Sequence, residues 1–403
     1  MEHKKFIPFW WKIVAVFTLG WVLMYADRTI LNPVMPHLAE EFGLTNAQLG
    51  LVNSVFFIAY AIAQIPSGTM GDRYGRRTIL VPGFILFGLL TGTTGLATSF
   101  FMFLLLRFVT GLGEGTYYGP SYAVATDNIP EKHLTVGTAI INSGMALGIS
   151  LGYMLSSYFT LELGMSWRVP FYLMTIPTLL AAGLIWFMLR PNPQLKDITK
   201  EPGHEKVNIW EQLKNRNVMI ILIMNFCSLY GFFMIITWLP QYLQLERGFH
   251  GSEVGYISSL IPWASIPAAI LFGMFSDRLG RKKPIIFLLV PIAIVSVCAV
   301  AFIDNKTMLV IALLIYGFTG KLALDPVLLS FMARNVSKRA YATMFSIYNF
   351  AGMLSSIIAP YITGYLVDIT GEMKTGFILA IIMMAIGLLA MAFTKEMPKE
   401  AQV

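Results

Sequence analysis

The sequence predicts an all-α membrane protein with twelve transmembrane helices arranged as two six-helix bundles. First, 56% of its 403 residues are hydrophobic and only 13% are charged, a composition far from that of soluble domains. Second, apolar runs of about 20 residues, the length that spans a hydrocarbon core, recur along the chain. Third, one polar loop of the first half returns in the second half.

The apolar runs are separated by short polar loops and give the expected spans. Their bounds are 12–34, 48–70, 78–98, 101–126, 134–159, 167–190, 217–245, 253–275, 283–303, 305–333, 340–366 and 373–394. The first run is too long, and too closely followed by others, to be a cleaved signal peptide. We expect an N-terminal bundle over 1–190, a cytoplasmic linker over 191–216 and a C-terminal bundle over 217–403.

The positions of Lys and Arg predict the orientation of the chain. They gather in the loops on the side of the N-terminus, whereas the opposite side holds only Arg168, Arg247, Lys306 and Lys374. By the positive-inside rule, both termini are cytoplasmic in a multi-pass protein of the cell membrane (plasma or inner membrane). The same asymmetry accounts for the net charge of +7 without a nucleic-acid partner.

The repeated loop divides the chain into equivalent halves. The segment "GTMGDRYGRR" (68–77) returns as "GMFSDRLGRKK" (273–283), with 277 − 72 = 205 for the aspartates and 280 − 75 = 205 for the glycines. Each copy contains six spans, an even number. Both halves therefore cross the membrane in the same direction, related by an axis along the membrane normal.

Six charged side chains fall in the interior of the predicted spans, away from their ends. Each costs about 2.5 to 3.5 kcal/mol at the centre of a bilayer even on the gentlest scale, so each requires a reason. They are three acids and three bases: Asp27, Glu114, Asp325, Arg28, Arg107 and Lys321. One alternative is that all six form static ion pairs that hold the bundle together.

Helix geometry limits how these charges pair. Neighbours on an α-helix point about 100° apart, so Asp27 and Arg28 cannot satisfy one another. Lys321 and Asp325 are four residues apart and can pair on one face. If Asp27 crosses to Arg107, then Arg28 and Glu114 remain as an unpaired base and an unpaired acid.

The two remaining groups suit different tasks. The planar fork of Arg28 can hold a carboxylate through two hydrogen bonds. Glu114 lies within "GLGEGTYYGP", and because burial among apolar groups favours the neutral acid, it can carry a proton. Tyr25 and Tyr118 fall near mid-membrane depth, where they could bind hydroxyl groups of a substrate.

Twelve spans in two halves, with the duplicated D-R-x-G-R loop, resemble the major facilitator superfamily. In that family the loop acts as a cytoplasmic latch, so the resemblance implies gating roles for its copies. Gly68 and Gly273 would allow close helix packing, and the aspartates would accept hydrogen bonds. The implied gating residues are Gly68, Asp72, Arg73, Arg76, Gly273, Asp277, Arg278 and Arg281.

Within the superfamily, "YADR" and "RFVTGLGEG" resemble the anion:cation symporter family. The resemblance implies a substrate-contacting Arg28 and proton coupling through Asp27, Arg107 and Glu114, and it places a substrate-contacting Asn at Asn349. The segment "GKLALDPVL" departs from the known pattern. There we assign Lys321 as a second anion anchor and Asp325 as a proton-coupling partner.

A competing resemblance points to the spinster-like lipid transporters. They share the acid and base of "YADRTILNPVMPHLAEEFGLTNAQLGL" and the G-x-G-E of "GLGEGTYYGPS". That resemblance implies a lysolipid or a lipid anion as cargo. Lipid carriage would require an apolar slot beside the charges, which the sequence does not show, so we favour the organic anion.

The predicted function is import of an organic anion, a sugar acid or another small carboxylate, by proton symport with alternating access. Anion antiport is a further alternative. We expect a monomer without cofactor or metal. An enzyme is not expected, because all five His lie in tails or loops and the two Cys lie in spans.

Overall fold

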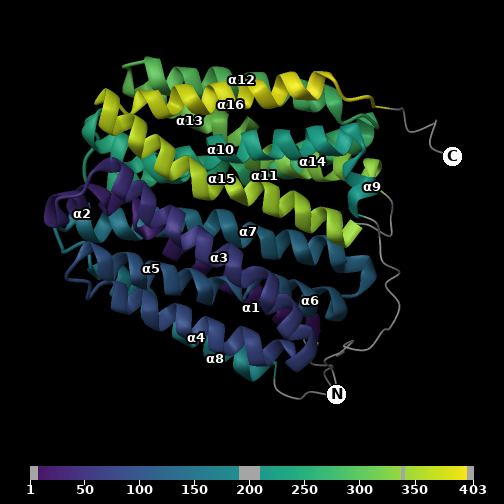
Figure 1. Ribbon diagram of the computed structural model, residues 1–403, viewed down its shortest axis with the longest axis horizontal. Coiled ribbons are helices and arrows are strands. Elements are labelled where there is room, and N and C mark those ends of the chain that lie inside the picture. Colours follow the sequence, from purple (N-terminus) through teal and green to yellow (C-terminus); the bar gives the residue numbers. More distant parts are fainter. Residues whose placement is uncertain (1–7, 190–208, 337–340, 397–403) are drawn as a thin grey trace, which may run out of the picture. The chain divides into compact units, whose positions relative to one another are not determined.

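The computed structural model describes residues 8–189, 209–336 and 341–396, and every regular element within these ranges is a helix (Figure 1). Most of the predicted linker, 191–208, lies outside the described residues. Its described end contains the short helix α9, Ile209–Leu213.

Each of the twelve predicted spans corresponds to helix in the described residues, which confirms the predicted fold class. Eleven helical stretches are long and apolar enough to cross a membrane. The remaining span, 101–126, is divided into two helices. The spans are formed by α1 (Phe9–Ile30), α3 (Asn46–Tyr74), α4 (Arg76–Thr94), α5 (Phe100–Gly115) with α6 (Tyr118–Asn128), α7 (Glu131–Ser156), α8 (Val169–Met188), α10 (Arg216–Leu245), α11 (Ser252–Leu279), α12 (Lys283–Phe302), α13 (Lys306–Thr319) with α14 (Lys321–Asn335), α15 (Tyr341–Thr370) and α16 (Lys374–Ala392).

The same span of each half is interrupted. The first half breaks between α5 and α6, and the second breaks at Gly320, where an extended backbone separates α13 from α14. The two spans also match at their start, where Ser99 and Asn305 cap α5 and α13, and 305 − 99 = 206. Interrupted helices in transporters lie where backbone lines a binding site or cavity.

The chain forms two compact units. The first contains residues 1–31 and 55–202, and so holds α1, most of α3, and α4 to α8. The second contains residues 32–54 and 203–403. It holds α9 to α16 together with the 3-10 turn Asn32–Val34, the short helix α2 (Met35–Phe42) and the first residues of α3. The two units are described separately below.

In the first unit, α1 packs closely on α7 through glycines spaced four apart. A Cβ at Gly144 would lie 2.7 Å from the carbonyl oxygen of Thr18, and one at Gly148 would lie 2.8 Å from the Cβ of Tyr25. At Gly152 the distance to the carbonyl oxygen of Ala26 would be 2.5 Å. The stretch "GMALGISLGY" therefore brings the two backbones together, as small residues do in membrane bundles.

The first turns of α3 pack on α15 within the second unit. Asp368 accepts hydrogen bonds from the backbone N–H groups of Asn46 and Ala47, each at 2.8 Å, and thereby caps the start of α3. Further along, the hydroxyl of Ser54 donates to the carbonyl oxygen of Ile357 at 2.6 Å. One continuous helix thus contributes to both compact units.

Candidate functional site

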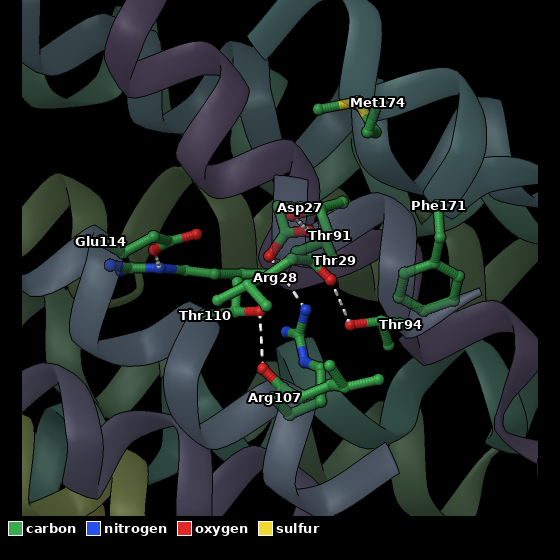
Figure 2. Close-up of polar contacts among 12 residues, drawn as sticks. Asp27, Arg28, Thr29, Thr91, Thr94, Arg107, Thr110, Glu114, Phe171 and Met174 are labelled. Carbon is green, nitrogen blue, oxygen red and sulfur yellow. Dashed lines mark hydrogen bonds and ion pairs between the residues drawn. The ribbon is translucent and has the colours of Figure 1, made fainter. Parts of the chain in front are cut away.

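Asp27 and Arg107 form a buried ion pair between α1 and α5, as the sequence predicts. Nη1 of Arg107 lies 2.9 Å from Oδ2 of Asp27, and both side chains are fully buried. Thr91 of α4 donates a hydrogen bond of 2.8 Å to Oδ1 of the same carboxylate (Figure 2). Both oxygens of Asp27 therefore have a donor, which a buried carboxylate requires.

Arg28 and Glu114 form a second ion pair, and the prediction that they remain unpaired is wrong. Nε of Arg28 lies 2.7 Å from Oε2 of Glu114, and the side-chain exposures are 5% and 0% (Figure 2). The reason is energetic, since a lone buried charge costs several kcal/mol by comparison with a paired one. The long side chain of Arg28 reaches from α1 to the carboxylate of Glu114 on α5.

Three glycines around Glu114 let α5 approach its neighbours. A Cβ at Gly115 would lie 2.5 Å from the carbonyl oxygen of Tyr60 on α3. One at Gly113 would lie 2.9 Å from the backbone nitrogen of Phe87 on α4. The segment "GLGEG" thus packs α5 against both helices and leaves its one acidic side chain directed at Arg28 on α1.

Aromatic rings surround the guanidinium group of Arg28. Its Cζ lies 4.6 Å from the ring centroids of both Tyr25 and Tyr60, and 5.4 Å from that of Phe57. Such cation–π contacts stabilise a desolvated cation by about 0.5 to 2 kcal/mol each. Because these rings contact the faces of the guanidinium, a hydrogen-bond acceptor can approach only its edge, where the N–H donors lie.

Several polar atoms of these ion pairs have no hydrogen-bond partner among the described residues. They are Nη2 of Arg28, Oε1 of Glu114, and Nε and Nη2 of Arg107. A buried donor without an acceptor costs about 1 to 3 kcal/mol. Unused donors on two arginines give this site the capacity to bind an anion.

The second unit contains the predicted Lys321–Asp325 ion pair. Nζ of Lys321, at the start of α14, contacts Oδ1 of Asp325 one turn later. The hydroxyl of Tyr348 on α15 donates to that same carboxylate oxygen at 2.8 Å, and Nζ of Lys321 lies 3.3 Å from the hydroxyl oxygen. Lys321 is buried, whereas the side chain of Asp325 is 38% exposed.

The remaining predicted substrate-binding residues differ in position. Tyr25 contacts Arg28 directly, and Tyr118 is half-buried on α6. Asn349 is half-buried on α15, next in sequence to Tyr348, and so lies in the second unit. The substrate-binding and proton-coupling roles themselves remain predictions.

The first copy of the repeated loop contains an ion pair between Arg76 and Asp127 at the end of α6. The guanidinium of Arg73 lies 5.2 Å from the ring of Tyr74. The side chain of Asp72 lies outside the described residues. A Cβ at Gly68 would meet no described atom within 4 Å, whereas one at Gly119 would lie 3.6 Å from the Cα of Gly68. The packing role of Gly68 stays a prediction.

The second copy is less closely packed. Arg278 and Arg281 are exposed, and a Cβ at Gly273 would make an ordinary 3.8 Å contact with Pro326. The packing role of Gly273 also stays a prediction. The side chain of Asp277 lies outside the described residues. Arg334, at the end of α14, donates to the carbonyl oxygen of Gly280 at 2.7 Å and holds this loop.

Sequence reasoning missed the neutral residues of the site. Thr91, Tyr60 and Phe56 complete the surroundings of the two ion pairs, and Phe56 lies 4.7 Å from Cζ of Arg107. One hydroxyl or ring in an apolar span carries no signal of its own. Asp27 alone indicated a missing neutral partner, because its second carboxylate oxygen requires a hydrogen-bond donor, which Thr91 provides.

The described residues contain no group of three or more His, Cys, Asp or Glu side chains that could hold a metal ion. Cys227 and Cys298 are free thiols on α10 and α12.

Curated relatives that match most of this chain have names that describe transporters. The chain is 25% identical to the "Probable sulfoacetate transporter SauU" of Cupriavidus necator, over 94% of this chain and 93% of that protein. It is 28% identical to the cis,cis-muconate transport protein of Acinetobacter baylyi, over 91% and 90%. It is 26% identical to the hexuronate transporter of Bacillus subtilis, again over 91% and 90%.

The solved structures that match support the fold. A bacterial homologue of the human lysosomal transporter Spinster, in an inward-facing and unoccupied conformation, superposes with a TM-score of 0.80 at 19% identity. The match covers 96% of this chain and 97% of that one. At this identity the likeness concerns the fold alone.

The family model described as "Major Facilitator Superfamily" matches residues 17–252 and 221–403. The family and the relatives named above are transporters and not enzymes. The chain belongs to the major facilitator superfamily.

Proposed function

We propose that this protein imports a small organic anion together with a proton by alternating access. The observation that carries the proposal is the buried Arg28–Glu114 ion pair, in which each partner has an unused polar atom. Arg28 can exchange the carboxylate of Glu114 for the carboxylate of a cargo. Glu114 can then remain in place only as the neutral acid.

Charge balance couples the two cargoes. With neither bound, Glu114 neutralises Arg28. With both bound, the anion neutralises Arg28 and the proton neutralises Glu114. A state with only one of them leaves a net buried charge, which costs several kcal/mol. The unloaded and fully loaded states are therefore the ones that can change conformation, and external acid promotes uptake.

The cargo class follows from the relatives. Sulfoacetate, muconate and hexuronate are all organic acids, and each is the cargo in the name of a relative that this chain matches over at least 91% of its length. We extend this class, sugar acids and other small carboxylates, to the present chain. A lysolipid or a lipid anion, which the spinster-like resemblance of the sequence implies, remains the alternative cargo.

Other parts of the chain have proposed roles in the same cycle. Asp27 with Arg107 acts as a second proton-linked pair. Lys321 provides a further anion anchor that Asp325 occupies in the unloaded state. Asn349 contacts the substrate, and the two D-R-x-G-R loops close the cytoplasmic side. We place the protein as a monomer in the cell membrane, with cytoplasmic termini.

Transport by the purified protein in liposomes tests the coupling. Glu114→Gln should lose accumulation driven by an external acid gradient yet retain exchange of labelled anion for unlabelled anion, because Gln mimics the protonated acid. Glu162→Gln, which removes an exposed acid beyond α7, is the matched control. Full gradient-driven accumulation by Glu114→Gln would refute Glu114 as proton carrier.

A thermal-shift series separates the cargo classes. Sugar acids, hydroxy acids and dicarboxylates should stabilise the protein, whereas lysophospholipids should not. Stabilisation by lysophospholipids alone would favour the lipid alternative. Anion uptake that requires a second anion inside the liposomes and does not depend on the proton gradient would favour anion antiport.

A further inference from the structure

One face of α1 carries two buried donors that lack acceptors. Trp21 and Arg28 are seven residues apart, nearly two full turns, so their side chains leave the helix on the same side. Each is only 5% exposed. Among the described residues, neither Nε1 of Trp21 nor Nη2 of Arg28 has a hydrogen-bond partner. Buried donors are rarely left in this state.

The surface between the two donors is aromatic. Tyr25, four residues after Trp21, stacks on the indole with ring centroids 5.5 Å apart and also lies under Arg28 at 4.6 Å. On α6, Tyr118 and Tyr122 meet the indole edge-on at 5.9 and 6.1 Å. Tyr25 thus contacts both donor side chains, and all three tyrosines are half-buried.

The stacked and edge-on rings of this face favour a flat molecule, which can pack against them. Asn142 of α7, an amide at the edge of the cluster, already accepts a hydrogen bond from the hydroxyl of Tyr122. Each hydroxyl of a sugar acid needs a polar partner when it is buried. An unsaturated or aromatic body needs none, and it gains contact with the tyrosine and tryptophan rings.

We propose that the cargo is a planar, unsaturated or aromatic carboxylate with a second hydrogen-bond acceptor at its far end. The carboxylate binds Arg28 and replaces Glu114, the body packs between Tyr25 and Tyr118, and the far acceptor receives the indole N–H of Trp21. Two helical turns, about 10 Å, accommodate a benzoate with a para substituent or a six-carbon dicarboxylate. This inference rests on the proposed function and narrows its substrate class.

The first test compares two dicarboxylates on the unmodified full-length protein. trans,trans-Muconate and adipate have the same number of carbons and the same two carboxylates, but only muconate is planar. Calorimetric titration at mildly acidic pH should give about tenfold tighter binding of muconate, because only the planar body stacks on the rings. Equal affinities would overturn the proposal.

The second test isolates the far acceptor. Trp21→Phe keeps an aromatic ring and removes the N–H, so it should weaken binding of 4-hydroxybenzoate about tenfold and leave benzoate unchanged. Trp186→Phe, at a surface tryptophan of α8, is the matched control and should change neither. An equal loss of affinity for benzoate and 4-hydroxybenzoate would show that the indole N–H does not bind the cargo and that Trp21 only packs against the neighbouring rings.

The two tests also distinguish failure of the planar-cargo proposal from failure of proton-coupled anion import. Uptake of D-galacturonate that depends on Arg28 and Glu114, without preference for muconate over adipate, would overturn the planar cargo and leave proton-coupled anion import standing. Failure of all these acids to bind or to be taken up would overturn both.

Discussion

Nε of Arg28 lies 2.7 Å from Oε2 of Glu114, so an arginine of α1 and an acid of α5 neutralise each other within the first unit. The next residue back, Asp27, is likewise neutralised by Arg107 on the same helix α5. Two consecutive residues of one helix therefore use two partners that are seven residues apart on another.

Replacing Arg28 tests whether the fork of the guanidinium matters beyond its charge. Arg28→Lys keeps the positive charge but loses the planar array of donors. We expect cargo affinity in a binding titration to fall at least about tenfold, since a bidentate, charge-assisted contact becomes a single point charge. Arg216→Lys, at an exposed arginine at the start of α10, should bind as the wild type does. Unchanged affinity in Arg28→Lys would exclude bidentate carboxylate binding.

The Asp27–Arg107 ion pair should show strong coupling in a double-mutant cycle. Asp27→Leu leaves Arg107 buried without its carboxylate, which we expect to destabilise the protein by about 3 to 5 kcal/mol. Asp27→Leu combined with Arg107→Leu removes both charges and should recover most of the thermal stability in detergent. Additive losses in the double variant would show that the two side chains do not depend on each other.

The close approach of α1 and α7 predicts a sharp difference between two glycines. Gly148→Ala places a Cβ 2.8 Å from that of Tyr25, so α1 must shift and cargo binding should weaken with thermal stability. Gly183→Ala on α8 is the control, because a Cβ there meets no described atom within 4 Å. Gly183→Ala should leave the melting temperature unchanged. Equal melting temperatures for the two variants would contradict the packing described for α7.

The cap on α3 predicts a further difference between two acids near the end of α15. Asp368→Ala removes three hydrogen bonds to Asn46 and Ala47 and should destabilise the protein by about 1 to 2 kcal/mol. Glu372→Ala removes an acid whose ion pair with Lys374 is largely exposed, which should change stability little. The comparison is read from thermal unfolding. Equal losses would mean that the cap contributes nothing beyond surface charge.

The sequence was sufficient for the fold because the bilayer imposes simple rules. Spans of fixed length, short loops and a duplicated motif give helix number and order, and α1 to α16 follow them. Span length and hydropathy predict one helix each for 305–333 and 101–126, and so miss the interruptions at Gly320 and between α5 and α6.

Only those ion pairs of the site that follow from residue spacing and charge were predicted from the sequence. Spacing was enough for the Lys321–Asp325 pair, which lies on one helix, and charge balance was enough for Asp27 with Arg107. The Arg28–Glu114 pair joins two helices, and whether the arginine side chain is long enough to connect them cannot be read from residue spacing along one helix. Neutral partners such as Thr91 and Tyr60 depend on tertiary packing alone.

The helix α3 has a mechanical consequence. Its residues Asn46–Ser54 belong to the second unit and the rest to the first, yet they form one uninterrupted helix. Because α3 is part of both units, it restricts rotation of one unit against the other. Any reorientation of the units must bend this helix near Ser54 or peel its first turns from α15, breaking the bonds of Asp368. The two units therefore cannot reorient without a change in α3 or in its contacts with α15.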